Sequence, residues 1–107
     1  LGIEVLDHYN NIHQSSGHLY ITRVPGADTD KRQDIIVKMA ERGIATNVHY
    51  KPLPMMTAYR NMGFDIANYP NAYAHFANEI TLPLHTRLSD EDVAYIIDNY
   101  IDIIHEK

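Results

Sequence analysis

The sequence of 107 residues contains no cysteine and no tryptophan. Without cysteine the chain has neither a disulfide framework nor thiolate chemistry, and such a composition suits a reducing compartment. No run of about 18 apolar residues occurs, so no membrane-spanning helix is predicted, and the first residues lack the pattern of a secretory signal. We therefore expect a cytoplasmic location.

Basic residues are also scarce: nine Lys and Arg face fourteen Asp and Glu, which gives a net charge of −5. No basic patch offsets this charge, so we expect no nucleic-acid partner and no attraction to anionic membranes. A glycine-rich phosphate loop is absent, and the seven histidines do not form a His-x-x-x-His pair. With no cysteine to support them, we expect no metal site.

The length corresponds to one domain over residues 1–107, with 1–17 as an extended lead-in and 18–104 as its core. Strand-like composition occurs at 18–24, 44–50 and 80–84. Helical spacing of apolar residues covers 28–42, 55–62, a segment that opens at 68–70, and 89–104. Three strands interspersed with helices predict one small sheet packed against helices.

Two of these helices have clear boundaries and apolar stripes. Asp28 or Thr29 is expected to cap the first, Gly43 to end it, and Ser89 to cap the last. The stripe predicted for the first consists of Ile35, Ile36, Met39 and Ala40. The stripe predicted for the last consists of Val93, Ile96, Ile97, Tyr100, Ile101 and Ile104.

The stretch at 43–54 combines a predicted strand with a polar exit. It delivers an imidazole, a phenol and an amine in succession, from His49, Tyr50 and Lys51, just before two prolines. Polar groups carried into a rigid loop at a strand end are a common way to build a binding site. In a regular strand, His49 and Tyr50 would lie on opposite faces.

The same stretch resembles the GI-x-x-x-x-HY-x-PL motif of the DegT/DnrJ/EryC1/StrS family of pyridoxal-phosphate-dependent sugar aminotransferases. The similarity continues in the family's order and spacing at 58–59, 63–64, 69–72, 79–84 and 88–93. It covers roughly residues 17–104. One departure is Pro54, since many members have histidine there.

This resemblance implies the C-terminal small domain of a fold-type-I aminotransferase. The fold class would be α/β (α+β) in two layers, with a small, largely antiparallel three-stranded sheet packed against helices. The larger N-terminal domain, with the Schiff-base lysine and the phosphate cup, would lie elsewhere, and Leu1 as first residue agrees with a fragment. None of the chain's lysines (Lys31, Lys38, Lys51 and Lys107) lies in the family's Schiff-base motif.

We accordingly assign no catalytic and no cofactor-binding residue, and expect the fragment alone to be inactive and to bind no pyridoxal phosphate. The resemblance implies that this chain supplies the substrate side of the cleft. Tyr50, His49 and Lys51 are the candidate substrate-binding residues, and Tyr59 is a flanking candidate that could equally be helix packing.

The partners implied by the family are the N-terminal cofactor-binding domain of the same polypeptide, a nucleotide-linked keto sugar and an amino-acid donor such as glutamate. The parent is expected to be a homodimer that makes an amino sugar for a surface polysaccharide. Three alternatives stay open from the sequence: a cofactor-dependent sugar dehydratase of the same family, a non-catalytic α/β ligand-binding module, and a dimerisation domain.

Overall fold

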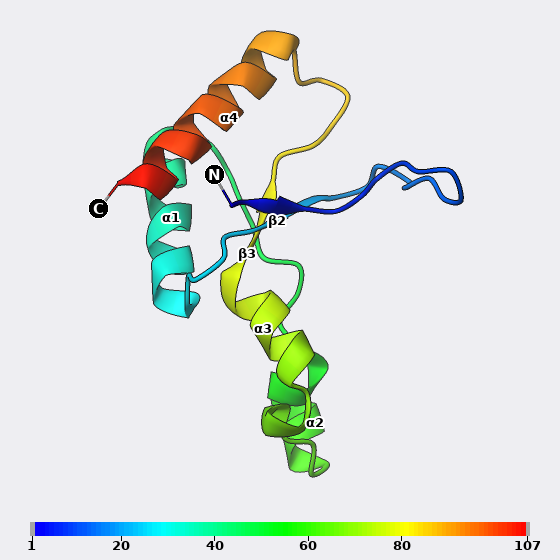
Figure 1. Cartoon of the computed structure of the whole chain (residues 1–107). Coiled ribbons are helices and arrows are strands. Elements are labelled where there is room, and N and C mark those ends of the chain that lie inside the picture. Colours follow the sequence, from blue (N-terminus) through cyan, green and yellow to red (C-terminus); the bar gives the residue numbers. More distant parts are fainter. Residues whose placement is uncertain (1, 107) are drawn as a thin grey trace.

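A three-stranded antiparallel sheet in the order β1-β2-β3 lies at the centre of the computed structural model, which describes residues 2–106 (Figure 1). β1 spans Glu4–Val5, β2 spans Tyr20–Arg23 and β3 spans Glu79–Leu82. Thr22 of β2 stands opposite Ile80 of β3. The prediction of a small three-stranded antiparallel sheet with helices packed on it is confirmed.

The strand predicted at 44–50 is wrong, because only Asn47 of this segment pairs with the sheet. Asn47 and Thr81 exchange two backbone hydrogen bonds, at 3.2 and 2.8 Å, in an isolated bridge. The ladder stops there for two reasons. The Asn47 side chain accepts from the Val48 amide at 2.7 Å, and the His49 amide donates to the Glu79 carboxylate instead of to a strand carbonyl. The third strand of the sheet is instead β1, which comes from the expected lead-in and pairs with β2.

The helices α1 (Thr29–Glu41) and α4 (Asp90–His105) begin at the predicted caps. Asp28 accepts from the Lys31 amide at 2.8 Å. Ser89 and Asp92 cap α4 reciprocally, each side chain accepting from the other residue's amide. The three acidic residues of its first turn also favour the positive end of the helix dipole.

Both helices cover the same face of the sheet, as Figure 1 shows, and the core lies between these layers. The prediction for α1 is confirmed for Ile35 and Met39, whereas Ala40 is exposed. The core residues are Ile35, Met39, Ile44, Ile80, Leu82, Ile96, Tyr100 and Ile103.

The stripe predicted for α4 is only partly correct. Val93 and Ile97 are 41% and 44% exposed, while Ile103, which was not in the predicted stripe, is completely buried. Ile96, Tyr100 and Ile103 follow spacings of four and three residues, so they form one narrow line along the helix. The sheet has only three short strands, and it covers that line rather than the full apolar face.

A second group of short helices lies between α1 and β3 in the sequence. It contains η1 (Leu53–Met55), α2 (Thr57–Asn61), η2 (Ile66–Asn68) and α3 (Pro70–Asn78). In Figure 1, α2 and α3 project away from α4. The helix expected over 55–62 is shorter than predicted, because Met56 is extended and separates η1 from α2.

Arg32 attaches α3 to α1. Its guanidinium lies 4.5 Å from the centroid of the Phe76 ring and donates to the Phe76 carbonyl. Stacking of a guanidinium on an aromatic face, combined with a hydrogen bond, is a typical use of a buried arginine. The α2–α3 region is therefore held to the core by a polar contact as well as by apolar packing.

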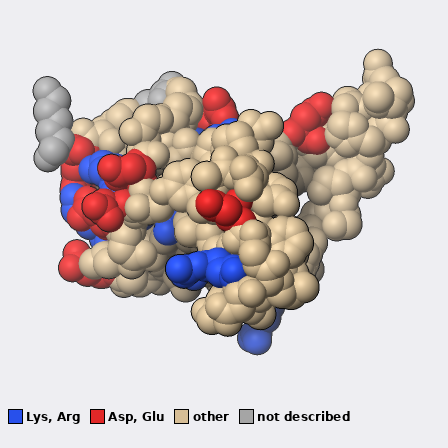
Figure 2. All heavy atoms as spheres, turned by 90° about the horizontal axis from the view of Figure 1, so that it is seen from below, with Lys and Arg blue, Asp and Glu red and all other residues tan. Residues whose placement is uncertain are grey.

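Ion pairs link the ends of α1 and α4. Lys38 lies 2.9 Å from Glu106, and Arg42 lies 2.6 Å from Asp102. On the face shown in Figure 2, acidic and basic side chains lie next to one another at one end. Across residues 2–106, no helix has the length and apolar character needed to cross a bilayer.

Candidate functional site

The segment that carries His49, Tyr50 and Lys51 is an exposed loop beside β3. Tyr50 is 66% exposed, and its ring meets the His49 ring edge-on, with centroids 4.6 Å apart. The two rings lie together rather than on opposite faces, because the segment is not a regular strand. The loop therefore presents an imidazole and a phenol side by side at the surface.

His49 is held by two residues of β3 that lie on the face opposite the main core. Its amide donates to Glu79 Oε2 at 2.8 Å, and its Nδ1 lies 2.8 Å from Thr81 Oγ1. The Thr81 hydroxyl in turn donates to Glu79 Oε1. Glu79 is completely buried, so its carboxylate is satisfied by groups of this loop and its own strand.

Two open hollows flank the loop. His49 lines one of 280 Å³, together with Leu19, Asn47 and Leu84. Lys51 lines the other, of 540 Å³, together with Arg60 and Pro54. Pro54 stands where many family members have histidine, and its pyrrolidine ring forms part of the wall of the larger hollow.

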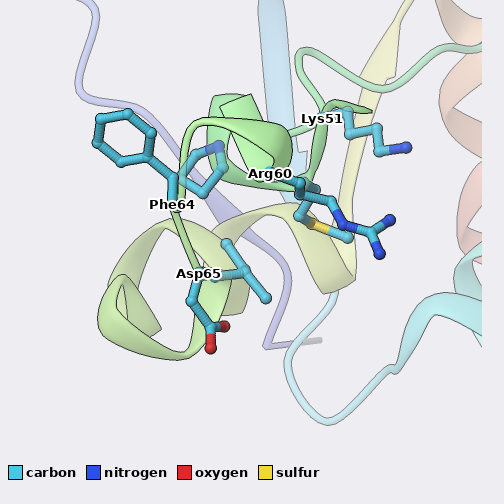
Figure 3. Close-up of a pocket in the computed structure, with 8 residues that line it drawn as sticks. Lys51, Arg60, Phe64 and Asp65 are labelled. Carbon is cyan, nitrogen blue, oxygen red and sulfur yellow. The ribbon is translucent and has the colours of Figure 1, made fainter. Parts of the chain in front are cut away.

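The larger hollow brings two cationic groups together. In Figure 3 the side chains of Lys51 and Arg60 extend toward the same side, and Asp65 points elsewhere. Asp65 accepts from the Ala67 amide at 2.9 Å and so caps η2. Within residues 2–106, neither Lys51 nor Arg60 has an ion-pair partner. Two cations without carboxylate partners form a potential anion-binding wall.

Arg60 was not identified by the sequence analysis. It stands on α2, nine positions after Lys51, within the segment at 55–62 that was predicted as a helix from the spacing of its apolar residues. The two prolines between Lys51 and Arg60 were the available signal, since they turn the chain back and bring the two side chains to one hollow.

Tyr59 does not join His49 and Tyr50. Its ring packs edge-on against Phe64 with centroids 6.0 Å apart, and 37% of the residue is exposed. Tyr59 thus contacts Phe64, which follows α2 and lines the larger hollow. The histidines are not part of a metal cluster: residues 2–106 contain no group of three or more His, Asp or Glu that could hold a metal ion.

Pyridoxal phosphate needs a lysine amine, an acid for the ring nitrogen and a phosphate cradle in one place. The described lysines do not meet this requirement. Lys31 and Lys38 are both paired with Asp34 on α1, and the hydrogen bonds that Lys38 donates to Glu106 and Asp34 raise its pKa. A raised pKa disfavours the neutral amine that Schiff-base formation uses. Lys51 faces an open hollow whose one carboxylate already caps a helix, and Lys107 lies outside the described residues.

Solved structures share this fold at high similarity. Spr1654 of Streptococcus pneumoniae, assigned as a sugar aminotransferase, is 59% identical with a TM-score of 0.93, over 95% of this chain and 26% of that protein. Its structures include forms with pyridoxal phosphate and with pyridoxamine phosphate. PseC of Helicobacter pylori, an aminotransferase of pseudoaminic acid biosynthesis, is 30% identical with a TM-score of 0.77, over 85% of this chain and 24% of that protein.

Among curated relatives, the spore coat polysaccharide biosynthesis protein SpsC of Bacillus subtilis is 31% identical over 90 residues, which are 81% of this chain and 23% of SpsC. The chain thus spans about a quarter of the length of the relatives it matches. The model of the DegT/DnrJ/EryC1/StrS aminotransferase family matches residues 2–100. The chain belongs to the DegT/DnrJ/EryC1/StrS aminotransferase family.

Proposed function

We propose that this chain is the C-terminal domain of a longer pyridoxal-phosphate-dependent aminotransferase that acts on a nucleotide-linked keto sugar. The domain supplies the substrate side of the cleft, and an N-terminal domain of the same polypeptide supplies the cofactor and its lysine. The parent is a cytoplasmic homodimer that makes an amino sugar for a surface polysaccharide. Family membership and the fraction of its relatives' length that the chain covers both support this assignment.

The observation that carries the proposal is the pair of cations in the hollow beside an exposed aromatic loop. Lys51 and Arg60 line the 540 Å³ hollow without an ion-pair partner among residues 2–106. The diphosphate of a nucleotide sugar carries charges that such a wall attracts, and a guanidinium can bind its oxygens in a bidentate manner. We assign Lys51 and Arg60 to the diphosphate.

We place the sugar toward the rings of His49 and Tyr50, because these two residues immediately precede Lys51 in the sequence. Tyr50 offers a phenol that donates to or accepts from a sugar hydroxyl, and its exposure leaves it available for contact. Pro52 and Pro54 restrict the loop, so less conformational freedom is lost when a ligand binds. Tyr59 supports this wall through Phe64 instead of contacting substrate.

The test uses the complete polypeptide with pyridoxal phosphate, glutamate and a panel of nucleotide-linked keto sugars, followed by mass spectrometry of the sugar product. We expect a keto group to be replaced by an amino group, and no turnover from the 107-residue chain alone. A product that has lost water without gaining nitrogen would identify a dehydratase instead. Turnover by the chain alone would overturn the domain assignment.

The diphosphate assignment is tested by substitution of the two cations in the same enzyme. Lys51→Ala and Arg60→Ala should each raise KM for the nucleotide sugar about tenfold, with a smaller effect on kcat, because they remove charge-assisted hydrogen bonds from a non-reacting part of the substrate. Lys31→Ala is the matched control, since Lys31 pairs with Asp34 on α1 and does not line the hollow. Equal KM values in all three variants would refute the assignment.

A further inference from the structure

The hydrogen bonds around His49 constrain which of its ring nitrogens carries the proton. Glu79 is completely buried and Thr81 is almost so. The Glu79 carboxylate receives the His49 amide on one oxygen and the Thr81 hydroxyl on the other. A carboxylate only accepts hydrogen bonds, so both of these neighbours must donate to it.

The Thr81 hydroxyl has a single proton, which this arrangement commits to Glu79. Its contact with His49 Nδ1, at 2.8 Å, then requires that the ring nitrogen be the donor. In the opposite arrangement, Thr81 would donate to His49 and leave one oxygen of Glu79 without a hydrogen bond. An unsatisfied buried polar group costs about 1–3 kcal/mol, and more when it is charged, so this arrangement is strongly disfavoured.

The other ring nitrogen of His49 is not completely buried. Nε2 has no hydrogen-bond partner among residues 2–106, and it is not one of the buried polar atoms that lack a partner. His49 lines the 280 Å³ hollow beside Thr81. In a neutral ring with the proton on Nδ1, Nε2 carries a lone pair and acts only as an acceptor.

We propose that Glu79 and Thr81 are positioning residues that hold neutral His49 as a hydrogen-bond acceptor for a hydroxyl of the sugar. This inference rests on the proposed function for the identity of the ligand, but the proton position follows from this chain alone. The lone pair repels phosphate and carboxylate oxygens and attracts an O–H donor. Recognition is therefore divided: Lys51 and Arg60 take the diphosphate, and His49 takes the sugar.

The first experiment measures the tautomer directly, without substrate. Long-range ¹H–¹⁵N spectra are recorded at pH 8 on the complete polypeptide with ¹⁵N-labelled histidine, and His49→Gln identifies the His49 signals. We expect a protonated Nδ1 and an unprotonated Nε2 for His49. Predominant protonation at Nε2 in the unsubstituted protein would overturn the inference whatever the variants do.

The second experiment asks whether Thr81 controls that tautomer. Thr81→Val removes the hydroxyl at similar volume, so the His49 population should shift toward the Nε2-protonated form. Thr81→Ser keeps the hydroxyl and should restore the Nδ1-protonated form. If Thr81→Val is poorly folded, Glu79→Gln serves in its place, since it removes the charge that orients the hydroxyl. An unchanged tautomer in a folded variant would refute the positioning role.

The third experiment separates this inference from the proposed function. Binding of a nucleotide-linked sugar and of the nucleoside diphosphate alone is measured with the unsubstituted protein and Thr81→Val. We expect affinity for the sugar nucleotide to fall about three- to tenfold, while affinity for the diphosphate is unchanged. Equal loss for both ligands would contradict the division of roles. Absence of transamination in an enzyme that shows the expected tautomer would refute the proposed function but leave the proton assignment intact.

Discussion

The hydroxyl of Tyr100 lies 2.6 Å from the hydroxyl of Thr22, so a buried hydrogen bond connects the last helix to the central strand. Thr22 Oγ1 donates its own proton to the Ile80 carbonyl at 2.7 Å. Tyr100 is consequently the donor to Thr22. These two hydrogen bonds in series connect α4, β2 and β3 within the core. They make the stability of the domain sensitive to the ionisation of the Tyr100 phenol.

Stability should fall as the pH rises from about 10 to 12, and Tyr100 should be a main cause. Burial raises the pKa of Tyr100 to about 12 from 10.0. Above pH 10 the unfolded chain loses this proton while the folded chain keeps it, so alkali favours unfolding; below pH 10 the contribution is constant. A difference of about two pKa units corresponds to about 3 kcal/mol at most.

The measurement is urea unfolding at a series of pH values, for the unsubstituted chain and for Tyr100→Phe. The variant should be less stable at pH 8 by about 1 kcal/mol, because Thr22 loses its donor, and its stability should depend less on pH above 10. Tyr73→Phe is the control, because Tyr73 is an exposed residue of α3 whose hydroxyl makes no hydrogen bond within residues 2–106. Parallel pH curves for Tyr100→Phe and the unsubstituted chain would contradict this assignment.

Ser89→Ala should destabilise the domain by about 1 kcal/mol, because it removes one half of the reciprocal cap of α4. The Ser89 hydroxyl accepts from the Asp92 amide at 3.1 Å, so the substitution leaves that amide without this acceptor. Thermal unfolding followed by circular dichroism measures the loss. Ser89→Thr retains a capping hydroxyl and should recover most of it, whereas equal loss in both variants would point to another cause.

Ile103→Ala should cost about 2–5 kcal/mol, since it leaves a cavity in the core between α4 and the sheet. Ile97→Ala is the matched control on the same helix, because Ile97 is 44% exposed, and it should cost under about 1 kcal/mol in the 107-residue chain. Denaturant midpoints of the two variants decide the matter. A larger loss for Ile97→Ala would mean that the core is not where the structure has it.

Gly43→Ala should destabilise the turn after α1 by about 1 kcal/mol, because φ at Gly43 is +77°, where a side chain is disfavoured. Apart from Gly43 and its two chain neighbours, no heavy atom among residues 2–106 lies within 4 Å of the position that a Cβ would occupy, so the effect is one of backbone conformation, not of packing. Gly43→Asn should cost less, since asparagine tolerates this region better. A chemical-denaturation series on both variants provides the comparison, and a neutral Gly43→Ala would contradict the argument.

Local signals in the sequence were sufficient where the chain itself determines the structure. Asp28, Ser89 and Gly43 mark helix ends through hydrogen bonds and backbone angles that involve only neighbouring residues, and all three predictions are confirmed. The short strands β2 and β3 were likewise located from their composition. These features depend on distances of a few residues along the chain.

The errors arose where partners distant in sequence decide the outcome. The segment at 44–50 has a strand-like composition, but a buried carboxylate at Glu79 captures the His49 amide and ends the pairing after Asn47. The burial of Ile103 in preference to Ile97 depends on how α4 crosses the sheet. Neither the hydrogen bond from the His49 amide to Glu79 nor the way α4 crosses the sheet leaves a periodic signal in the sequence.

The candidate site was predicted in part for the same reason. The order of His49, Tyr50 and Lys51 identified the loop, and the structure places all three at or beside open hollows or the surface. The meeting of Lys51 with Arg60, and the support of His49 by Thr81, depend on how the loop folds back after the two prolines and along β3. Their roles in substrate binding stay predictions.

The alternation of β3 gives the loop its dependence on strand register. Glu79 and Thr81 point to one side, and Ile80 and Leu82 point to the other. A slip of one residue in β3 would therefore exchange every polar neighbour of the imidazole for an aliphatic one while also emptying the hydrophobic interior. Correct pairing of the two four-residue strands β2 and β3 is thus required both for the hydrogen bonds that hold the His49 loop and for the core. A misaligned chain would lose both together.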